Sequence, residues 1–153
     1  MNNRPKAILT PQGKQNLETE LADLRAKRPQ IVEEVQRARA LGDLRENSAY
    51  QANKDKMRQT DRRITQLELI LRHSEVVEKT NKNEVQLGSR IEVEFNGQAQ
   101  VFELVGESEA DPKARRISLH SPLGKAFLGK KPHDLVEVVT PAGKNTYKIV
   151  KID

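Results

Sequence analysis

The chain has 153 residues, with 27 lysines and arginines against 22 aspartates and glutamates, for a net charge of +5. The sequence contains no cysteine, which excludes disulfides, thiol nucleophiles and cysteine-ligated zinc sites. No apolar run of about 18 residues predicts a membrane span, and residues 1–6 lack a secretory signal, so we expect a cytoplasmic protein without membrane association. Charged residues make up 32% and aromatic residues 3%, which is typical either of a partly disordered chain or of extensive exposed helix.

The first half of the chain has the pattern of two long helices. Thr10 is a suitable N-cap, and Pro11 follows it at the position where a first-turn proline fits. A heptad series, interrupted only at Arg28, comprises Leu17, Leu21, Leu24, Ile31, Val35 and Ala38. A second series comprises Tyr50, Asn53, Met57, Thr60, Ile64, Leu67, Leu71 and Ser74. Each series predicts one continuous contact face on its helix.

The two series mirror each other about residue 44. The residue numbers of Leu24 and Ile64 add to 88, as do those of Leu17 and Leu71, Leu21 and Leu67, Ile31 and Met57, Ala38 and Tyr50, and Arg28 and Thr60. A chain folded back on itself near residue 44 therefore forms an antiparallel helical hairpin. Pro29 should kink the first helix without ending it, because the series continues in register, and we interpret Arg28 as a snorkelling or paired structural arginine.

The second half has the pattern of a small sheet domain. We assign residues 1–79 to the coiled-coil domain, residues 80–84 to a linker, and residues 85–153 to a compact α+β domain. The predicted strands are 90–95, 99–105, 116–119, 135–139 and 147–152, with a tight turn at 96–97 and a short helix at 121–127.

The segment that joins the helices carries two carboxylates, Asp43 and Glu46, which are spaced three residues apart. One interpretation is helix capping, with Asp43 as the N-cap and Glu46 completing a capping box. The other is a carboxylate pair presented to a divalent cation such as Mg²⁺, which prefers oxygen ligands. Two carboxylates form an incomplete site, so the second interpretation requires ligands from a partner.

Basic residues follow this segment. Lys54, Arg58 and Arg62 are four residues apart and form one stripe on the second helix. The stripe either contacts phosphates or is a solvated face with pairs to Asp55 or Asp61. Tyr50 either packs in the seam between the helices or stacks on a base.

The run from Gly42 to Asn47, followed by Tyr50, resembles the tip motif of the Gre family of transcript cleavage factors of bacterial RNA polymerase. The similarity covers essentially the whole chain. Other segments that resemble the family are 10–13, 28–29, 105–107, 117–118, 121–124 and 140–143. Residues 50–54 and 61–63 look like the GreB type and residues 107–112 more like the GreA type, so the subtype stays open.

The resemblance implies an N-terminal antiparallel coiled coil and a C-terminal FKBP-like domain in a monomeric protein that is not itself an enzyme. It implies docking on the rim of the RNA polymerase secondary channel and activation of the polymerase's own cleavage of backtracked nascent RNA. It implies that Asp43 and Glu46 are the catalytic acids and hold Mg²⁺ jointly with the polymerase. The resemblance and the basic stripe together give Arg45, Tyr50, Lys54 and Arg58 as RNA-contacting residues, and the resemblance gives Ser121, Pro122 and Leu123 as docking residues.

Two other functions remain open. One is a channel binder of the same fold that inhibits the polymerase without cleavage, and the other is a structural coiled-coil adaptor. The presence of both Asp43 and Glu46 favours a cleavage factor, because an inhibitor or an adaptor has no need of an acid pair beside Gly42.

The mirrored series makes a direct prediction about helix pairing. Cysteines introduced as Leu24→Cys and Ile64→Cys should form a disulfide within one chain under mild oxidation, because the two positions are predicted to face each other. Gel mobility under non-reducing conditions measures the product. Efficient cross-linking at a shifted register, with none between positions 24 and 64, contradicts the predicted pairing.

Overall fold

The computed structural model describes residues 6–42, 47–81 and 83–153. The chain divides into two compact units, one formed by residues 15–73 and the other by residues up to 14 together with residues 74–153. The boundaries at residues 79 and 85 that the sequence suggested stay a prediction. Each unit is described below by itself.

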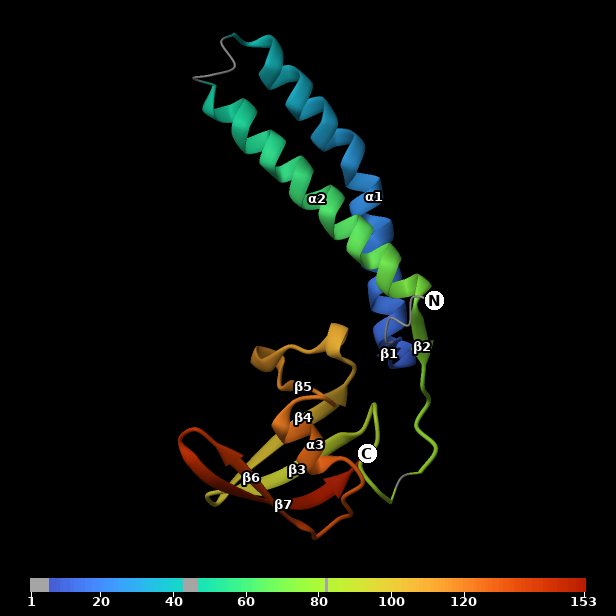
Figure 1. Cartoon of the computed structure of the whole chain (residues 1–153), viewed down its shortest axis with the longest axis vertical. Coiled ribbons are helices and arrows are strands. Elements are labelled where there is room, and N and C mark those ends of the chain that lie inside the picture. Colours follow the sequence, from blue (N-terminus) through green and yellow to red (C-terminus); the bar gives the residue numbers. More distant parts are fainter. Residues whose placement is uncertain (1–5, 43–46, 82) are drawn as a thin grey trace. The chain divides into compact units, whose positions relative to one another are not determined.

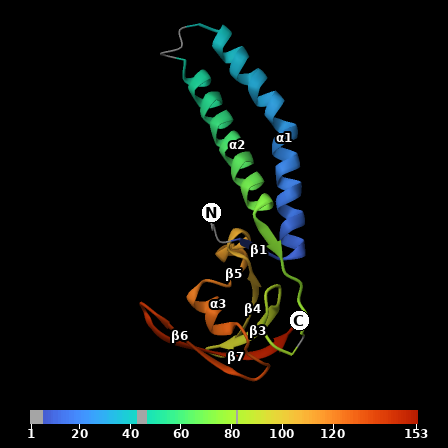
Figure 2. The same cartoon turned by 45° about the vertical axis from the view of Figure 1, so that its right-hand side comes forward.

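The helical unit is an antiparallel hairpin of α1 (Pro11–Ala40) and α2 (Ser48–Arg72), which run side by side in both views (Figures 1 and 2). Thr10 caps α1 as expected, since its hydroxyl oxygen accepts a hydrogen bond from the Gly13 N–H at 2.9 Å. The predicted fold class, a long helical hairpin with an α+β sheet domain, is confirmed.

The contact face between the helices follows the two heptad series. Its buried residues are Leu17, Leu21, Ile31, Ala38 and Leu67. The remaining α2 positions of the series are half-buried: Tyr50, Asn53, Met57, Thr60, Ile64 and Leu71. One narrow apolar seam therefore holds the hairpin together, and the outer face of each helix is in contact with solvent.

The middle of α1 departs from this packing. The helix continues through Pro29, yet residues 25–30 are all exposed. Arg28 lies on the surface and donates two hydrogen bonds to Asp61, from Nε to Oδ1 at 2.6 Å and from Nη2 to Oδ2 at 3.2 Å. The prediction of a paired structural arginine is confirmed, and its partner Asp61 lies one position from Thr60, the position that faces Arg28 in the mirrored series.

Ion pairs cross the hairpin on both sides of this point. Arg63 donates to both carboxylate oxygens of Glu20, at 2.6 and 2.8 Å, and Lys56 lies 2.8 Å from a carboxylate oxygen of Glu34. The hydrogen bond from Arg63 holds the pKa of Glu20 below its ordinary value. This pair stabilises the hairpin above the ordinary glutamate pKa and is lost as pH falls through the lowered value. Because both side chains are partly solvated, the contribution is small.

Two short strands accompany the sheet domain. β1 (Ala7–Leu9) pairs in parallel with β2 (Ser74–Val76), with Ala7 opposite Ser74 and Leu9 opposite Val76. Sequence reasoning missed both strands and placed Ser74 in the helical series, which is wrong because α2 ends at Arg72. Leu9 is fully buried, so β1 contributes to the interior.

The main sheet has five strands in the order β5-β4-β3-β7-β6. Its elements are β3 (Arg90–Phe95), β4 (Gln98–Val105), β5 (Arg116–Ser118), α3 (Pro122–Phe127), β6 (Leu135–Thr140) and β7 (Gly143–Ile152), with 3₁₀ turns η1 (Glu107–Glu109) and η2 (Pro112–Ala114). All five predicted strands and the predicted helix are present. Asn96 and Gly97 both have positive φ, 50° and 75°, as the predicted tight turn between β3 and β4 requires.

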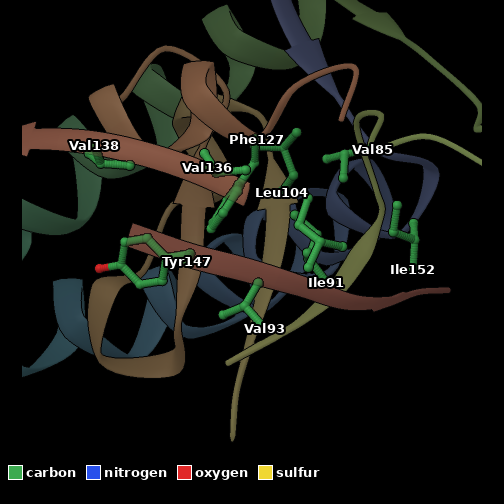
Figure 3. Close-up of a cluster of buried hydrophobic side chains, with 10 residues drawn as sticks. Val85, Ile91, Val93, Leu104, Phe127, Val136, Val138, Tyr147 and Ile152 are labelled. Atoms are coloured by element: carbon green, nitrogen blue, oxygen red, sulfur yellow. The ribbon is translucent and has the colours of Figure 1, made fainter. Parts of the chain in front are cut away.

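The core of this domain lies between α3 and one face of the sheet (Figure 3). Its buried side chains are Val85, Ile91, Val93, Leu104, Phe127, Val136, Val138, Tyr147, Ile149 and Ile152. The rings of Phe127 and Tyr147 meet edge to face, with centroids 5.7 Å apart. Phe127 is the last residue of α3, so its burial fixes the short helix on the sheet.

Glu109 forms a buried polar contact with the start of α1. Its carboxylate accepts from the Thr10 N–H at 2.8 Å and from the Thr10 hydroxyl at 2.5 Å, while Arg116 Nη2 lies 3.4 Å away. A Cβ on Gly13 would lie 1.8 Å from Glu109 Oε1, so only glycine leaves room for the carboxylate. The first turn of α1 is thereby held to η1.

This contact predicts different effects for two neighbouring glutamates. Glu109→Ala should lower the free energy of unfolding by about 1–3 kcal/mol, because the buried donors of Thr10 lose their acceptor. Glu107→Ala is the control, since Glu107 is exposed, and should change the free energy of unfolding by less than about 0.5 kcal/mol. Urea denaturation measures both, and equal effects contradict the assigned role.

Candidate functional site

The end of the hairpin is built where α1 finishes and α2 begins. α1 ends at Ala40, and Gly42 follows with a φ of +135°, a value that favours glycine. α2 begins at Ser48, with Asn47 as its N-cap. Asn47 Oδ1 accepts from the Tyr50 N–H at 2.9 Å, and Asn47 Nδ2 donates to the Ala38 carbonyl at 2.6 Å.

The predicted acids Asp43 and Glu46, and the predicted RNA-contacting Arg45, lie outside the described residues. The structure nevertheless decides one alternative from the sequence. The N-cap of α2 is Asn47, so the interpretation of Asp43 as the cap of this helix is wrong. Sequence reasoning missed Asn47, although asparagine immediately before a helix is a recognised capping signal.

Tyr50 and Lys54 lie together on the first turns of α2. Tyr50 is half-buried at a seam position, and Lys54 Nζ lies 5.6 Å from the centroid of its ring. A cation at this distance interacts favourably with the face of the aromatic ring. The contact places a positive charge and a planar ring next to each other near the end of the hairpin.

The basic residues of the hairpin fall into two groups. Those that pair across the helices are Arg25, Arg28, Lys56 and Arg63. In the predicted stripe, Arg58 lies 3.6 Å from Asp55 on its own helix. Within the described residues, no carboxylate lies within ion-pair distance of Lys54 or Arg62. Asp61, offered as a partner for the stripe, pairs with Arg28 instead.

The predicted docking segment forms the start of α3. The Ser121 hydroxyl accepts from the Gly124 N–H at 3.0 Å and donates to the Ser118 carbonyl at 2.7 Å, so it serves as the N-cap. Leu123 packs against the core, while Pro122 is exposed. A Cβ on Gly124 would lie 2.0 Å from the Ser118 oxygen, which explains the glycine. Of the three predicted residues, Pro122 presents its side chain to solvent.

A cavity of about 360 Å³ lies close to this segment. It is lined by Lys6, Ala7, Ile8, Glu107, Ser108 and His120. His120, which lines the cavity, immediately precedes Ser121 and is two positions before the exposed Pro122 in the sequence.

The described residues contain no group of three or more histidine, aspartate or glutamate side chains arranged to hold a metal ion. No helix among them is both long and apolar enough to cross a membrane.

Comparison with known proteins identifies relatives of both halves. A family model described as "Transcription elongation factor, N-terminal" matches residues 7–76, and one described as "Transcription elongation factor, GreA/GreB, C-term" matches residues 79–153. The transcription elongation factor GreA of Lactococcus lactis subsp. cremoris is 39% identical over 150 residues, covering 95% of this chain and 96% of the relative. The GreA of Macrococcus caseolyticus is 42% identical, with 94% of each chain covered.

Among solved structures, the GreA factor homolog 1 protein of Thermus thermophilus is 28% identical, covers 97% of this chain and 99% of its own, and has a TM-score of 0.46. The fold defines the class of protein: this is a two-domain protein that carries a long two-helix hairpin and a small α+β sheet domain on one chain. The chain belongs to the GreA/GreB family of transcription elongation factors. The family suggested by the tip motif is confirmed.

Arg62 and Arg63 are adjacent but differ in their partners, which gives a prediction. Arg63→Ala should lower the free energy of unfolding by about 0.5–1 kcal/mol, because the half-exposed pair with Glu20 is lost. Arg62→Ala should change the free energy of unfolding by less than about 0.5 kcal/mol. It should instead weaken binding to single-stranded RNA. The slope of the logarithm of the binding constant against the logarithm of the salt concentration should become shallower by about 0.7 for each phosphate contact that is lost.

Thermal unfolding and RNA titrations at several salt concentrations measure these effects. If Arg62→Ala binds RNA as wild type does at every salt concentration, this part of the basic stripe is a solvated face.

Proposed function

We propose that this protein is a transcription elongation factor that binds bacterial RNA polymerase through its secondary channel. It stimulates the intrinsic cleavage of backtracked nascent RNA by the polymerase and so releases arrested complexes. The protein acts as a cofactor of the polymerase in the cytoplasm and functions as a monomer.

The observation that carries this proposal is the match of both Gre family models, which together extend over residues 7–153. The chain spans nearly the full length of the relatives named above. The tip motif from Gly42 to Asn47 adds support, because it retains both carboxylates at the turn of the hairpin.

The hairpin suits a narrow channel. α1 has 30 residues, and a helix of that length extends about 45 Å at 1.5 Å per residue. Because only one face of each helix is buried against the other, the arm is two helices thick. Such an arm can carry the segment 43–46 to a site that a globular domain cannot reach.

Asp43 and Glu46 are the residues that would hold Mg²⁺. Carboxylate oxygens are the donors that this cation prefers, and one or two protein carboxylates commonly share it with other groups and water. The donor set therefore fits a cation held jointly with the polymerase. When bound, Mg²⁺ supplies positive charge for the attacking water and the phosphate. The role of this chain is to bring the two carboxylates into the polymerase and orient them.

The other site residues have supporting roles in this proposal. In this proposal, Arg45 and the α2 residues Tyr50, Lys54 and Arg58 contact the 3′ part of the nascent RNA. The exposed ring at Pro122, held by the Ser121 cap and by the packing of Leu123, contacts the rim of the channel. Docking and chemistry thus rest on different parts of the chain.

The proposal is tested with purified protein added to a stalled, backtracked elongation complex. Asp43→Asn and Glu46→Gln preserve shape but remove the anionic oxygens. At saturating factor, each should slow cleavage by about tenfold or more, equivalent to about 1.4 kcal/mol in barrier height. Added Mg²⁺ should restore part of the rate by mass action. RNA length on denaturing gels measures cleavage.

Glu33→Gln is the matched control, because Glu33 is an exposed glutamate of α1 that pairs with Arg37 within its own helix. This variant should cleave as wild type does. Competition with labelled wild type should show unchanged affinity for the polymerase in all three variants. If wild type, Asp43→Asn and Glu46→Gln have the same cleavage rate at every Mg²⁺ concentration, the proposed mechanism is wrong.

A further inference from the structure

The Asn47 side chain forms hydrogen bonds with both the end of α1 and the start of α2. Asn47 Oδ1 accepts from the Tyr50 N–H at 2.9 Å, inside the first turn of α2. Asn47 Nδ2 donates to the Ala38 carbonyl at 2.6 Å, near the last turn of α1. The same carbonyl also accepts from the Leu41 N–H, at the longer distance of 3.3 Å.

Both partners are groups that helix ends leave unsatisfied. The first N–H groups of α2 and the last carbonyls of α1 have no partner within their own helices. A carboxamide satisfies one of each, because it carries both an acceptor and a donor. The donor and acceptor identities of the two backbone partners also fix which way the amide points. Aspartate would supply only acceptors, and alanine would supply neither group.

The residues between these two contacts include the segment that carries Asp43 and Glu46. Ala38 and Asn47 are nine positions apart, and the bond between them closes the connection at its base. A hydrogen bond between two helix ends reduces the range of distances that those ends sample. The tie from Asn47 to Ala38 therefore restrains the end of α1 relative to the start of α2.

We propose that Asn47 is a positioning residue, which fastens the end of α1 to the start of α2 and so sets the spacing of the two helix ends between which Asp43 and Glu46 lie in the sequence. This inference rests on the proposed function, in which the segment that carries those two acids delivers carboxylates to the polymerase. Carboxylates delivered to a shared cation must be placed accurately, since errors of about 1 Å can cost a hundredfold in rate.

The chain contains a matched control for this tie. Asn53 Nδ2 also donates across the hairpin, to the Glu34 carbonyl, but at 3.4 Å and two turns further from the tip. Asn53 lies in the interior of α2 and caps neither helix. Loss of the Asn53 contact removes a cross-helix hydrogen bond without opening the base of the connection.

The experiment compares Asn47→Ser with Asn53→Ser in the full chain. Serine keeps the N-cap function and adds no charge, but its side chain is too short to reach Ala38. Asn47→Ser should lower the cleavage rate at saturating factor by about tenfold, with the half-saturating factor concentration unchanged. Asn53→Ser should cleave within about twofold of wild type. Asn47→Asp, which keeps the shape and the cap acceptor, should also lose rate because it cannot donate.

A second measurement is independent of the polymerase. The chain has no cysteine, so nitroxide labels can be attached at Leu41→Cys and Ser48→Cys, two exposed positions on either side of the segment. Electron paramagnetic resonance should give a narrow distance distribution in the otherwise wild-type chain. The distribution should broaden with Asn47→Ser and stay narrow with Asn53→Ser.

The outcomes separate the two proposals. Wild-type protein that stimulates no cleavage overturns the proposed function, whereas the label distances still test the tie. A narrow distribution in Asn47→Ser overturns the tie itself. A broadened distribution with wild-type cleavage overturns the positioning role, and a broadened distribution with slowed cleavage and unchanged affinity supports it.

Discussion

Two helices without a third layer can bury only one stripe each, and the whole helical unit is built within that constraint. The apolar contact is a single seam that includes Leu17, Leu21 and Leu67, and it lapses in α1 between residues 25 and 30. Charged pairs cross the hairpin where apolar packing is thin, as Arg28 and Asp61 do. The high charge and low aromatic content of the chain follow from this geometry, because most of the hairpin surface faces water.

Sequence reasoning was accurate where structure is determined by neighbouring residues. The heptad series located both helices, and alternation followed by Asn96 and Gly97 located β3 and its turn. It failed where pairing is distant. Helical periodicity extends to Ser74, but that residue pairs with Ala7, and a three-residue strand has too few positions to show alternation. No local pattern distinguishes such a strand from the end of a helix.

The same distinction applies to the sites. The acid pair and the cap at Ser121 are visible in short motifs, whereas the second hydrogen bond of Asn47 goes to a backbone carbonyl on another helix. Glu109 lies in an acidic stretch that reads as a solvated loop. Its burial depends on Thr10, which is 99 positions away. A residue is hard to identify from a single sequence when its hydrogen-bond partner is a distant backbone group or a distant small polar side chain.

The close approach of Glu109 to Gly13 has a consequence for protein engineering and for evolution. A side chain at position 13 would occupy the space that the carboxylate fills, so these two positions form one complementary surface despite their separation in sequence. A chimera that takes residues 1–79 from one relative and the remainder from another divides that surface between two parents. Such a chimera keeps this contact only when the residue at position 13 from one parent is compatible with the residue at position 109 from the other. A change at either one therefore favours a compensating change at the other.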